Sequence, residues 1–100
     1  MPTYPTKADR ELVQAISKLK DEKEITGFLR DILTPSEIEE FSRRFQIAKL
    51  LWTTKLSYVD IAEKVGTSTT TVTRVGQWLY KEPWRGYSVL LQRIYGSSQR

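Results

Sequence analysis

The sequence contains no cysteine and no histidine, and these two absences exclude several kinds of site. Without cysteine there are no disulfides and no thiolate ligands, and without histidine there is no imidazole to act as a general base. The five glycines form no phosphate-binding motif. The carboxylates have the spacing of exposed helix starts; they are Glu37, Glu39, Glu40, Asp60 and Glu63. We therefore expect no metal site, no cofactor, no catalytic residues and no enzymatic activity.

Long apolar stretches are also missing. No run approaches the roughly 18 apolar residues that a membrane-spanning helix needs. The first ten residues lack the apolar core of a signal peptide. These features predict a cytoplasmic protein that has no membrane partner.

The chain has 100 residues, enough for one domain with a modest core, and a net charge of +4. The positive charge is unevenly placed. From Lys64 onward there are six basic residues and one acidic residue, Glu82. A basic region of this kind is typical of a surface that contacts nucleic-acid phosphates. A solvated basic tail is the alternative.

The periodicity predicts an all-α fold of five to six helices within a single domain, residues 1–100. Apolar residues recur at helical spacing over about 7–20, 21–32, 34–53 and 87–95, and no strand-like alternation of any length occurs. Thr34-Pro35-Ser36-Glu37 is a strong helix start, with a capping residue followed by proline and glutamate. We expect residues 1–6 to form a flexible arm and residues 96–100 a frayed tail.

Residues 57–79 predict two short helices joined by a tight turn. Ser57 can cap the first helix, with Asp60 placed for a capping box, and Gly66 can adopt the positive φ that ends it. Thr67 or Ser68 can cap the second helix.

The spacing within this stretch is that of a helix-turn-helix. Such a motif crosses its helices at about 90–120° around one small residue, with a glycine in the turn. Ala62 and Gly66 take these two places, and the apolar positions are Ile61, Val65, Val72 and Val75. The outward face of the second helix carries threonines and an arginine, which favours DNA binding. An ordinary αα-hairpin inside an all-α core is the alternative.

Apolar surface is in excess for one chain of this size. The helix over 34–53 is apolar around most of its circumference after Phe45, and the last helix also needs apolar cover. The tryptophans and tyrosines fall mostly near helix ends, where core or interface packing explains them. This excess predicts a homodimer.

From Leu33-Thr34-Pro35-Ser36-Glu37 through Arg43-Arg44 to Val72-Thr73-Arg74, the chain resembles the Trp repressor superfamily. It looks closest to the YerC/YecD branch of Trp-repressor-like proteins. The resemblance spans about 33–83 without an evident gap. It implies an intertwined, all-helical homodimer that places two recognition helices in successive major grooves of double-stranded DNA.

The resemblance also implies positions for a ligand pocket. The residues that match the tryptophan pocket of the repressor are Thr34, Arg44, Thr71 and Arg74. Two positions depart from the pattern: Val75 replaces a glycine and Trp78 replaces a serine. Because a valine and an indole both take up space near the ligand position, we expect no tryptophan corepression. Trp78 filling the site itself is one possibility, and any other effector stays open. Solvated or phosphate-contacting roles for Arg44 and Arg74 are the alternative.

By the same resemblance, Thr69 and Thr70 occupy the positions that read bases, with Thr73 one turn on. A threonine offers a hydroxyl to bases or phosphates and a methyl group to thymine. The candidate contacts to the DNA backbone are Tyr58, Lys64, Thr67, Ser68 and Arg74.

Taken together, these patterns predict a sequence-specific DNA-binding transcriptional regulator that acts as a homodimer, most simply as a repressor. A helix-turn-helix scaffold used as a protein-interaction module is the alternative function.

Overall fold

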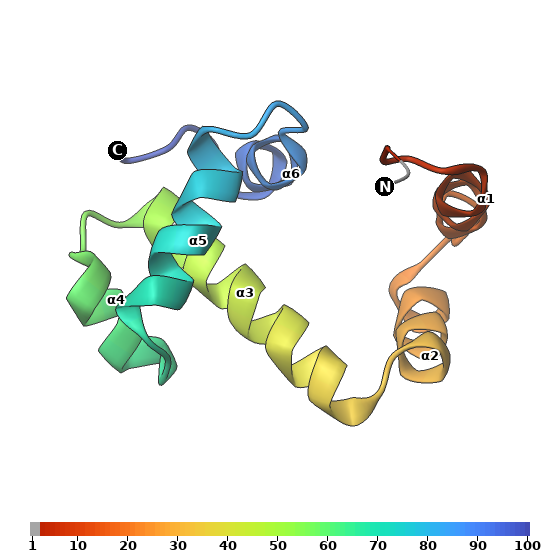
Figure 1. The fold of residues 1–100 in the computed structure, drawn as a ribbon, viewed down its shortest axis with the longest axis horizontal. Helices are drawn as coiled ribbons and strands as arrows, with labels where there is room; N and C mark the ends of the chain where they lie inside the picture. The colour runs from red at the N-terminus through yellow and green to blue at the C-terminus, as the bar shows by residue number, and fades with distance from the viewer. Residues whose placement is uncertain (1–2) are drawn as a thin grey trace. The chain divides into compact units, whose positions relative to one another are not determined.

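The computed structural model describes residues 3–100, and within this range it contains six α-helices and no β-strand. The all-α prediction is confirmed. The helices, in chain order, are α1 (Lys7–Ile16), α2 (Glu22–Ile32), α3 (Pro35–Thr53), α4 (Tyr58–Val65), α5 (Thr69–Tyr80) and α6 (Gly86–Tyr95) (Figure 1). Residues 1 and 2 of the predicted arm lie outside the described range. No helix between residues 3 and 100 is long and apolar enough to cross a membrane.

The chain forms two compact units that meet within α3. The first unit extends to Ile38 and contains α1, α2 and the start of α3. The second unit, Glu39–Arg100, contains the rest of α3 and the helices α4 to α6.

The first unit is built from helices whose ends are set by local hydrogen bonds. Thr6 caps α1 in a capping box, because its hydroxyl accepts from the Asp9 N–H (3.1 Å) and its own N–H donates to the Asp9 carboxylate (2.8 Å). Helix α1 ends at Ile16, earlier than the predicted Lys20. The reason is local: the Ser17 hydroxyl donates to the Gln14 carbonyl, and the next N–H groups form bonds to the third residue back. Asp21 then caps α2.

Neither α1 nor α2 contains a buried residue. Both helices are amphipathic, and each has an apolar stripe whose large side chains are 41–50% exposed. These side chains are Leu12, Val13 and Ile16 of α1 and Ile25, Leu29 and Ile32 of α2.

Helix α3 begins where the sequence predicted, at a capping box. The Thr34 hydroxyl accepts from the Glu37 N–H (3.2 Å), and the Thr34 N–H donates to the Glu37 carboxylate (2.9 Å). These hydrogen bonds hold the pKa of Glu37 below its ordinary value. Further along, two ion pairs at i,i+4 spacing line the polar side of α3, Arg43 with Glu39 and Arg44 with Glu40.

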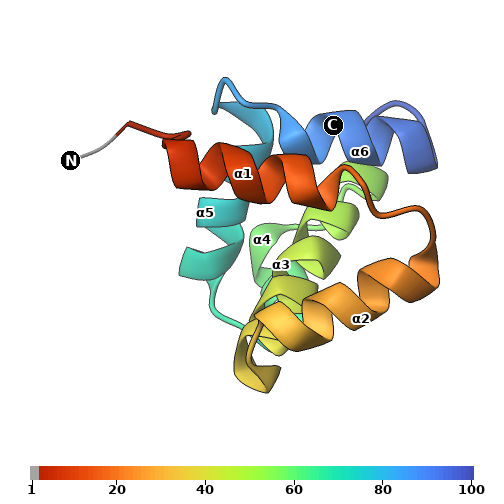
Figure 2. The ribbon, with the colours of Figure 1, turned by 90° about the vertical axis from the view of Figure 1, so that its right-hand side faces the viewer.

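The second unit has a continuous apolar core. Helix α3 contributes its C-terminal half, the helix-turn-helix contributes the inner faces of α4 and α5, and α6 contributes Leu91. Figures 1 and 2 show α4 beside α5, and the end of α5 beside α6. The buried side chains are Ile47, Ala48, Leu51, Trp52, Ile61, Ala62, Val72, Val75, Leu79 and Leu91.

The tail over 96–100 is hydrogen-bonded, contrary to the prediction that it frays. The Trp52 indole N–H donates to the Gly96 carbonyl (2.7 Å), and the Gln99 N–H donates to the Trp52 carbonyl (2.8 Å). The Arg100 guanidinium donates to the carbonyls of Leu51 (2.8 Å) and Leu56. These hydrogen bonds were not predictable from the sequence, because the acceptors include carbonyls at the C-terminal end of α3 that only the fold brings near the tail.

Candidate nucleic-acid interface

The turn between α4 and α5 has the geometry that its sequence predicts. Gly66 ends α4 in the left-handed conformation, with φ 81° and ψ 45°. Its N–H and that of Thr67 both donate to the Ala62 carbonyl at 2.9 Å. Ser68 then caps α5, because its hydroxyl accepts from the Thr71 N–H at 3.2 Å. Only three residues separate α4 from α5, so α5 is held closely against α4.

The inner positions of the motif meet as the spacing predicts. Ile61, Val72 and Val75 are fully buried, Ala62 is nearly so, and Val65 packs against this cluster from the side. The helix-turn-helix is therefore held by the same core that anchors α3.

The outer face of α5 carries hydroxyl groups at the end where the helix begins. Thr69, Thr70, Thr73 and Arg74 are all exposed. The Thr73 hydroxyl donates to the Thr69 carbonyl (2.9 Å), and its oxygen can still accept a hydrogen bond. Such a face can accept from base amino groups and contact the thymine methyl. Helix α5 has no acidic residue that would repel phosphates.

Thr67 and Ser68, two of the predicted contacts to the DNA backbone, lie in the turn between α4 and α5. The Ser68 hydroxyl lies 3.0 Å from the Thr71 hydroxyl, in addition to its cap bond. Thr67 is half-buried. The first N–H groups of α5 lack partners within the helix, as at any helix N-terminus, so the backbone rather than the Ser68 side chain is the natural donor to a phosphate.

Lys64 lies on an open groove of about 550 Å³ between the polar side of α3 and the last turn of α4. The groove is lined by Glu39, Ser42, Arg43, Gln46, Lys49, Leu50, Lys64 and Val65. The sequence did not single out Arg43 and Lys49 as neighbours of Lys64, because they come from another helix.

Tyr58 begins α4, and its ring lies over Gly76 in the middle of α5. Gly76 was not among the predicted site residues. One signal was present in the sequence: a glycine in a helix interior costs roughly 1 kcal/mol relative to alanine, so a close approach by another group is a common reason for it.

The six pocket candidates are divided between the two compact units. Thr34 caps α3 in the first unit, whereas the other five residues belong to the second. Val75 is fully buried in the core, so its side chain fills the interior and no open pocket. Thr71 bonds to Ser68 across the first turn of α5, and Arg74 is exposed.

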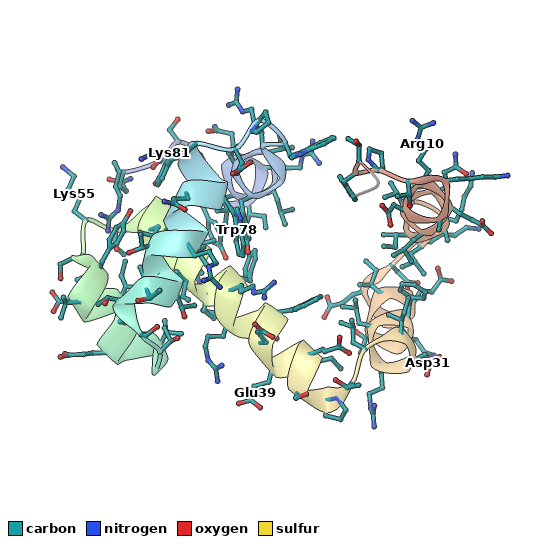
Figure 3. All side chains as sticks on the ribbon, viewed as in Figure 1. Arg10, Asp31, Glu39, Lys55, Trp78 and Lys81 are labelled. Atoms are coloured by element: carbon teal, nitrogen blue, oxygen red, sulfur yellow. The ribbon has the colours of Figure 1, made fainter. Side chains whose placement is uncertain are left out.

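Arg44 and Trp78 do come together. The Arg44 guanidinium carbon lies 5.4 Å from the centre of the Trp78 ring and 5.4 Å from that of Phe41. The same guanidinium donates to the Glu40 carboxylate at 2.8 Å. Figure 3 labels Trp78 on α5. The cation is thus placed over two aromatic rings of its own chain.

Tyr87 of α6 lies near the same cation. Its partial burial raises the pKa of the phenol, and the positive charge of Arg44 acts in the opposite direction. Aromatic side chains from α3, α5 and α6 therefore gather around Arg44.

Comparisons with known proteins agree with this geometry. The sequence profile of the family described as Trp repressor protein matches residues 8–94. A TrpR-like protein from Eubacterium eligens shares 40% identity and a TM-score of 0.77, over 90% of this chain and 91% of that one. A candidate Trp repressor from Staphylococcus aureus shares 31% identity and a TM-score of 0.81, over 93% and 91%. No curated protein matches this chain.

Proposed function

The chain belongs to the Trp repressor family, whose members are helix-turn-helix DNA-binding regulators, and from this premise we propose that it is a homodimeric, sequence-specific repressor of transcription. It binds double-stranded DNA in the cytoplasm through α4 and α5, and it does so without tryptophan as corepressor.

The observation that carries the proposal is the exposed first half of α5. Thr69, Thr70 and Thr73 present hydroxyl and methyl groups on one face, and no carboxylate interrupts them. Base recognition by a helix-turn-helix uses the N-terminal residues of its second helix. We assign base contacts to these three threonines. Contacts to the DNA backbone come from Tyr58, Lys64, Thr67, Arg74 and the N–H groups after Ser68.

The bare apolar stripes of α1 and α2 support the homodimer. Side chains such as Leu12 and Leu29 are more than 40% exposed in a single chain, and Ile94 of α6 is also exposed. A second copy supplies matching apolar surface and gains stability by burying it. A symmetric pair of recognition helices about 34 Å apart then fits two successive major grooves.

The contacts of Arg44 support the absence of tryptophan corepression. The guanidinium already lies over the Trp78 indole and is paired with Glu40. A free tryptophan would have to displace the indole that the protein itself supplies.

Selection of bound sequences from random DNA, followed by mobility-shift assays in a salt series, tests the function. We expect a palindrome to be enriched and its affinity to fall steeply with salt, by a slope of about −0.9 for each phosphate contact. Thr70→Ala with Thr73→Ala should weaken binding to the palindrome more than binding to random DNA. Thr26→Ala in α2 is the matched control and should change neither.

Three outcomes would decide against the proposal or a part of it. Failure to enrich any palindrome would remove the sequence-specific function and favour a protein-interaction module instead. Specific, saturable binding of tryptophan in calorimetry would remove the ligand-independent part, and a monomer at micromolar concentration in sedimentation would remove the dimer.

A further inference from the structure

The ring of Tyr58 lies close to the backbone of α5 at Gly76. A Cβ atom placed on Gly76 would be 2.7 Å from the Tyr58 hydroxyl oxygen, 3.4 Å from Cζ and 3.7 Å from Cε2. The first of these distances is shorter than any non-bonded contact that a carbon atom tolerates. Any residue other than glycine at position 76 would therefore push the phenol out of this place.

Gly76 is buried at the boundary between the inner face of α5 and the face that carries the threonines assigned to DNA contact. It is seven residues after Thr69 and three after Thr73, and residues at these spacings share one face of an α-helix. The Tyr58 ring covers Gly76 at this boundary. Among residues 3–100 the Tyr58 hydroxyl has no hydrogen-bond partner, and the side chain is 36% exposed.

We propose that Gly76, by lacking a side chain, provides the space that the Tyr58 ring occupies, here called the seat. We propose further that the hydroxyl held in this place donates a hydrogen bond to a DNA phosphate. The inference rests on the proposed function, because it assigns a further contact to the same DNA-binding surface. It names Gly76, which contacts no DNA itself, as the residue that positions the donor.

A phosphate fits this place better than a base edge does. Gly76 is about 10 Å along the helix from Thr69, at a rise of 1.5 Å per residue. Base contacts come from the N-terminal end of a recognition helix, whereas the first helix of the motif crosses the DNA backbone. Tyr58 is the first residue of that first helix. A tyrosine hydroxyl is also a common neutral donor to phosphate oxygens.

The seat also explains a glycine that the helix itself disfavours. Gly76 has ordinary helical φ, so no turn requires it. Gly27, in the interior of α2, has no atom within 4 Å of an added Cβ and provides a matched control.

Five variants, one of them a double substitution, test the proposal on the palindrome selected by the unsubstituted protein. Tyr58→Phe keeps the ring and removes the donor, and it should weaken binding about tenfold. Gly76→Ala keeps the donor and displaces it, and it should cause a similar loss without lowering the melting temperature, because alanine favours the helix. Adding Gly76→Ala to Tyr58→Ala should cause no further loss. Gly27→Ala should leave the affinity unchanged.

The salt dependence gives a second signature. The phenol carries no charge, so Tyr58→Phe should lower affinity equally at all salt concentrations, whereas Lys64→Ala should reduce the salt slope by about 1 if Lys64 contacts a phosphate.

Wild-type affinity in Tyr58→Phe, or additive losses in Tyr58→Ala and Gly76→Ala, would overturn the proposal. The seat itself is measured without DNA. The Hα protons of Gly76 should show a ring-current shift in NMR spectra that disappears in Tyr58→Ala. If this shift is present and the protein selects no palindrome, the proposed function fails and the phosphate contact fails with it. If palindromes are selected and the shift is absent, only the seat is wrong.

Discussion

The two compact units of this chain contrast in how they use their apolar residues. In the second unit, side chains from α3 to α6 bury one another in a continuous core, where Ile47, Leu51 and Ile61 have no exposed surface. In the first unit, α1 and α2 have equally regular stripes and no buried residue at all. The amphipathic pattern of a helix therefore says which face is to be covered, and it does not say by which chain. A continuous core supports the helix-turn-helix, whereas the apolar faces of α1 and α2 stay exposed in the single chain.

The largest effect should come from truncating the same residue type in each unit. Leu51 is fully buried and Leu29 is 41% exposed. Leu51→Ala should lower the free energy of unfolding by about 2–5 kcal/mol at any protein concentration. Leu29→Ala should cost less, and its cost should depend on protein concentration, because in the proposed homodimer a second copy covers this side chain. Chemical denaturation at several concentrations measures both. Equal, concentration-independent losses would remove the contrast between the units.

A charge placed in the stripe of α2 should affect assembly. Ile25→Asp puts a carboxylate on the apolar face, where burying it is costly, and should weaken dimerisation at least about tenfold in sedimentation equilibrium. Thr26→Asp adds the same charge one residue along, away from the stripe, and should leave dimerisation nearly unchanged. Equal behaviour of the two variants would show that the stripe is not the interface.

The cap at the start of α3 lies at the end of the first unit. Thr34→Ala removes the acceptor for the Glu37 N–H and should lower stability by about 1 kcal/mol. Ser42→Ala, within the same helix and without a capping role, should cost little in the same thermal melts. A full loss of α2 and α3 together in circular dichroism would instead indicate that the cap holds the first unit in place.

The stability of the second unit should depend on Tyr87 at alkaline pH. Its pKa is raised above 10.0 by burial, so the neutral phenol is favoured in the folded state. The corresponding stability is present below pH 10 and is lost as the pH rises through the raised pKa. Tyr87→Phe should flatten this alkaline fall in thermal melts. Arg44→Gln should raise the pKa of Tyr87 further, seen as a later phenolate absorbance, because the opposing positive charge is gone.

The smallest expected effect is on stability at acid pH and comes from Glu37, at the end of the first unit. Its pKa is lowered by the Thr34 backbone N–H first and the Thr34 hydroxyl second. This contribution is present above the ordinary pKa of 4.5 and is lost as the pH falls through the lowered value. Glu37→Gln should remove part of the acid dependence of the melting temperature and leave the alkaline side unchanged. If the melting temperature of Glu37→Gln falls at acid pH just as that of the unsubstituted protein does, other carboxylates dominate the acid dependence.

Local signals in the sequence predicted the helices and the motif well. Thr34 with Glu37, Ser57 and Ser68 form helix caps, and Gly66 takes the left-handed conformation that glycine permits. These features were predictable because caps and turns depend on residues three or four apart. The buried positions of the motif were also predicted, since helical spacing alone brings Ile61 and Val72 to the inner faces.

What the sequence did not predict depends on groups far apart in the chain. The seat of Tyr58 on Gly76 requires the crossing of two helices to be known in detail. The place of Val75 in the core, rather than beside a ligand, depends on how α5 is rotated against α3. The stack of Arg44 on Trp78 joins residues 34 positions apart. Pattern and spacing contain no information on such pairs.

The bonded tail has a consequence for the order in which the protein is made. The Trp52 indole cannot form its hydrogen bond until Gly96, 44 residues later, has been synthesised. The Leu51 carbonyl likewise has its donor only once Arg100, 49 residues later, is present. Leu51 and Trp52 lie at the end of α3, just before the helix-turn-helix. During translation, which adds residues from the N-terminus, α4 and α5 leave the ribosome before the end of α3 is closed. The hydrogen bonds that join the tail to the end of α3, beside the helix-turn-helix, thus form only after Arg100 has been synthesised.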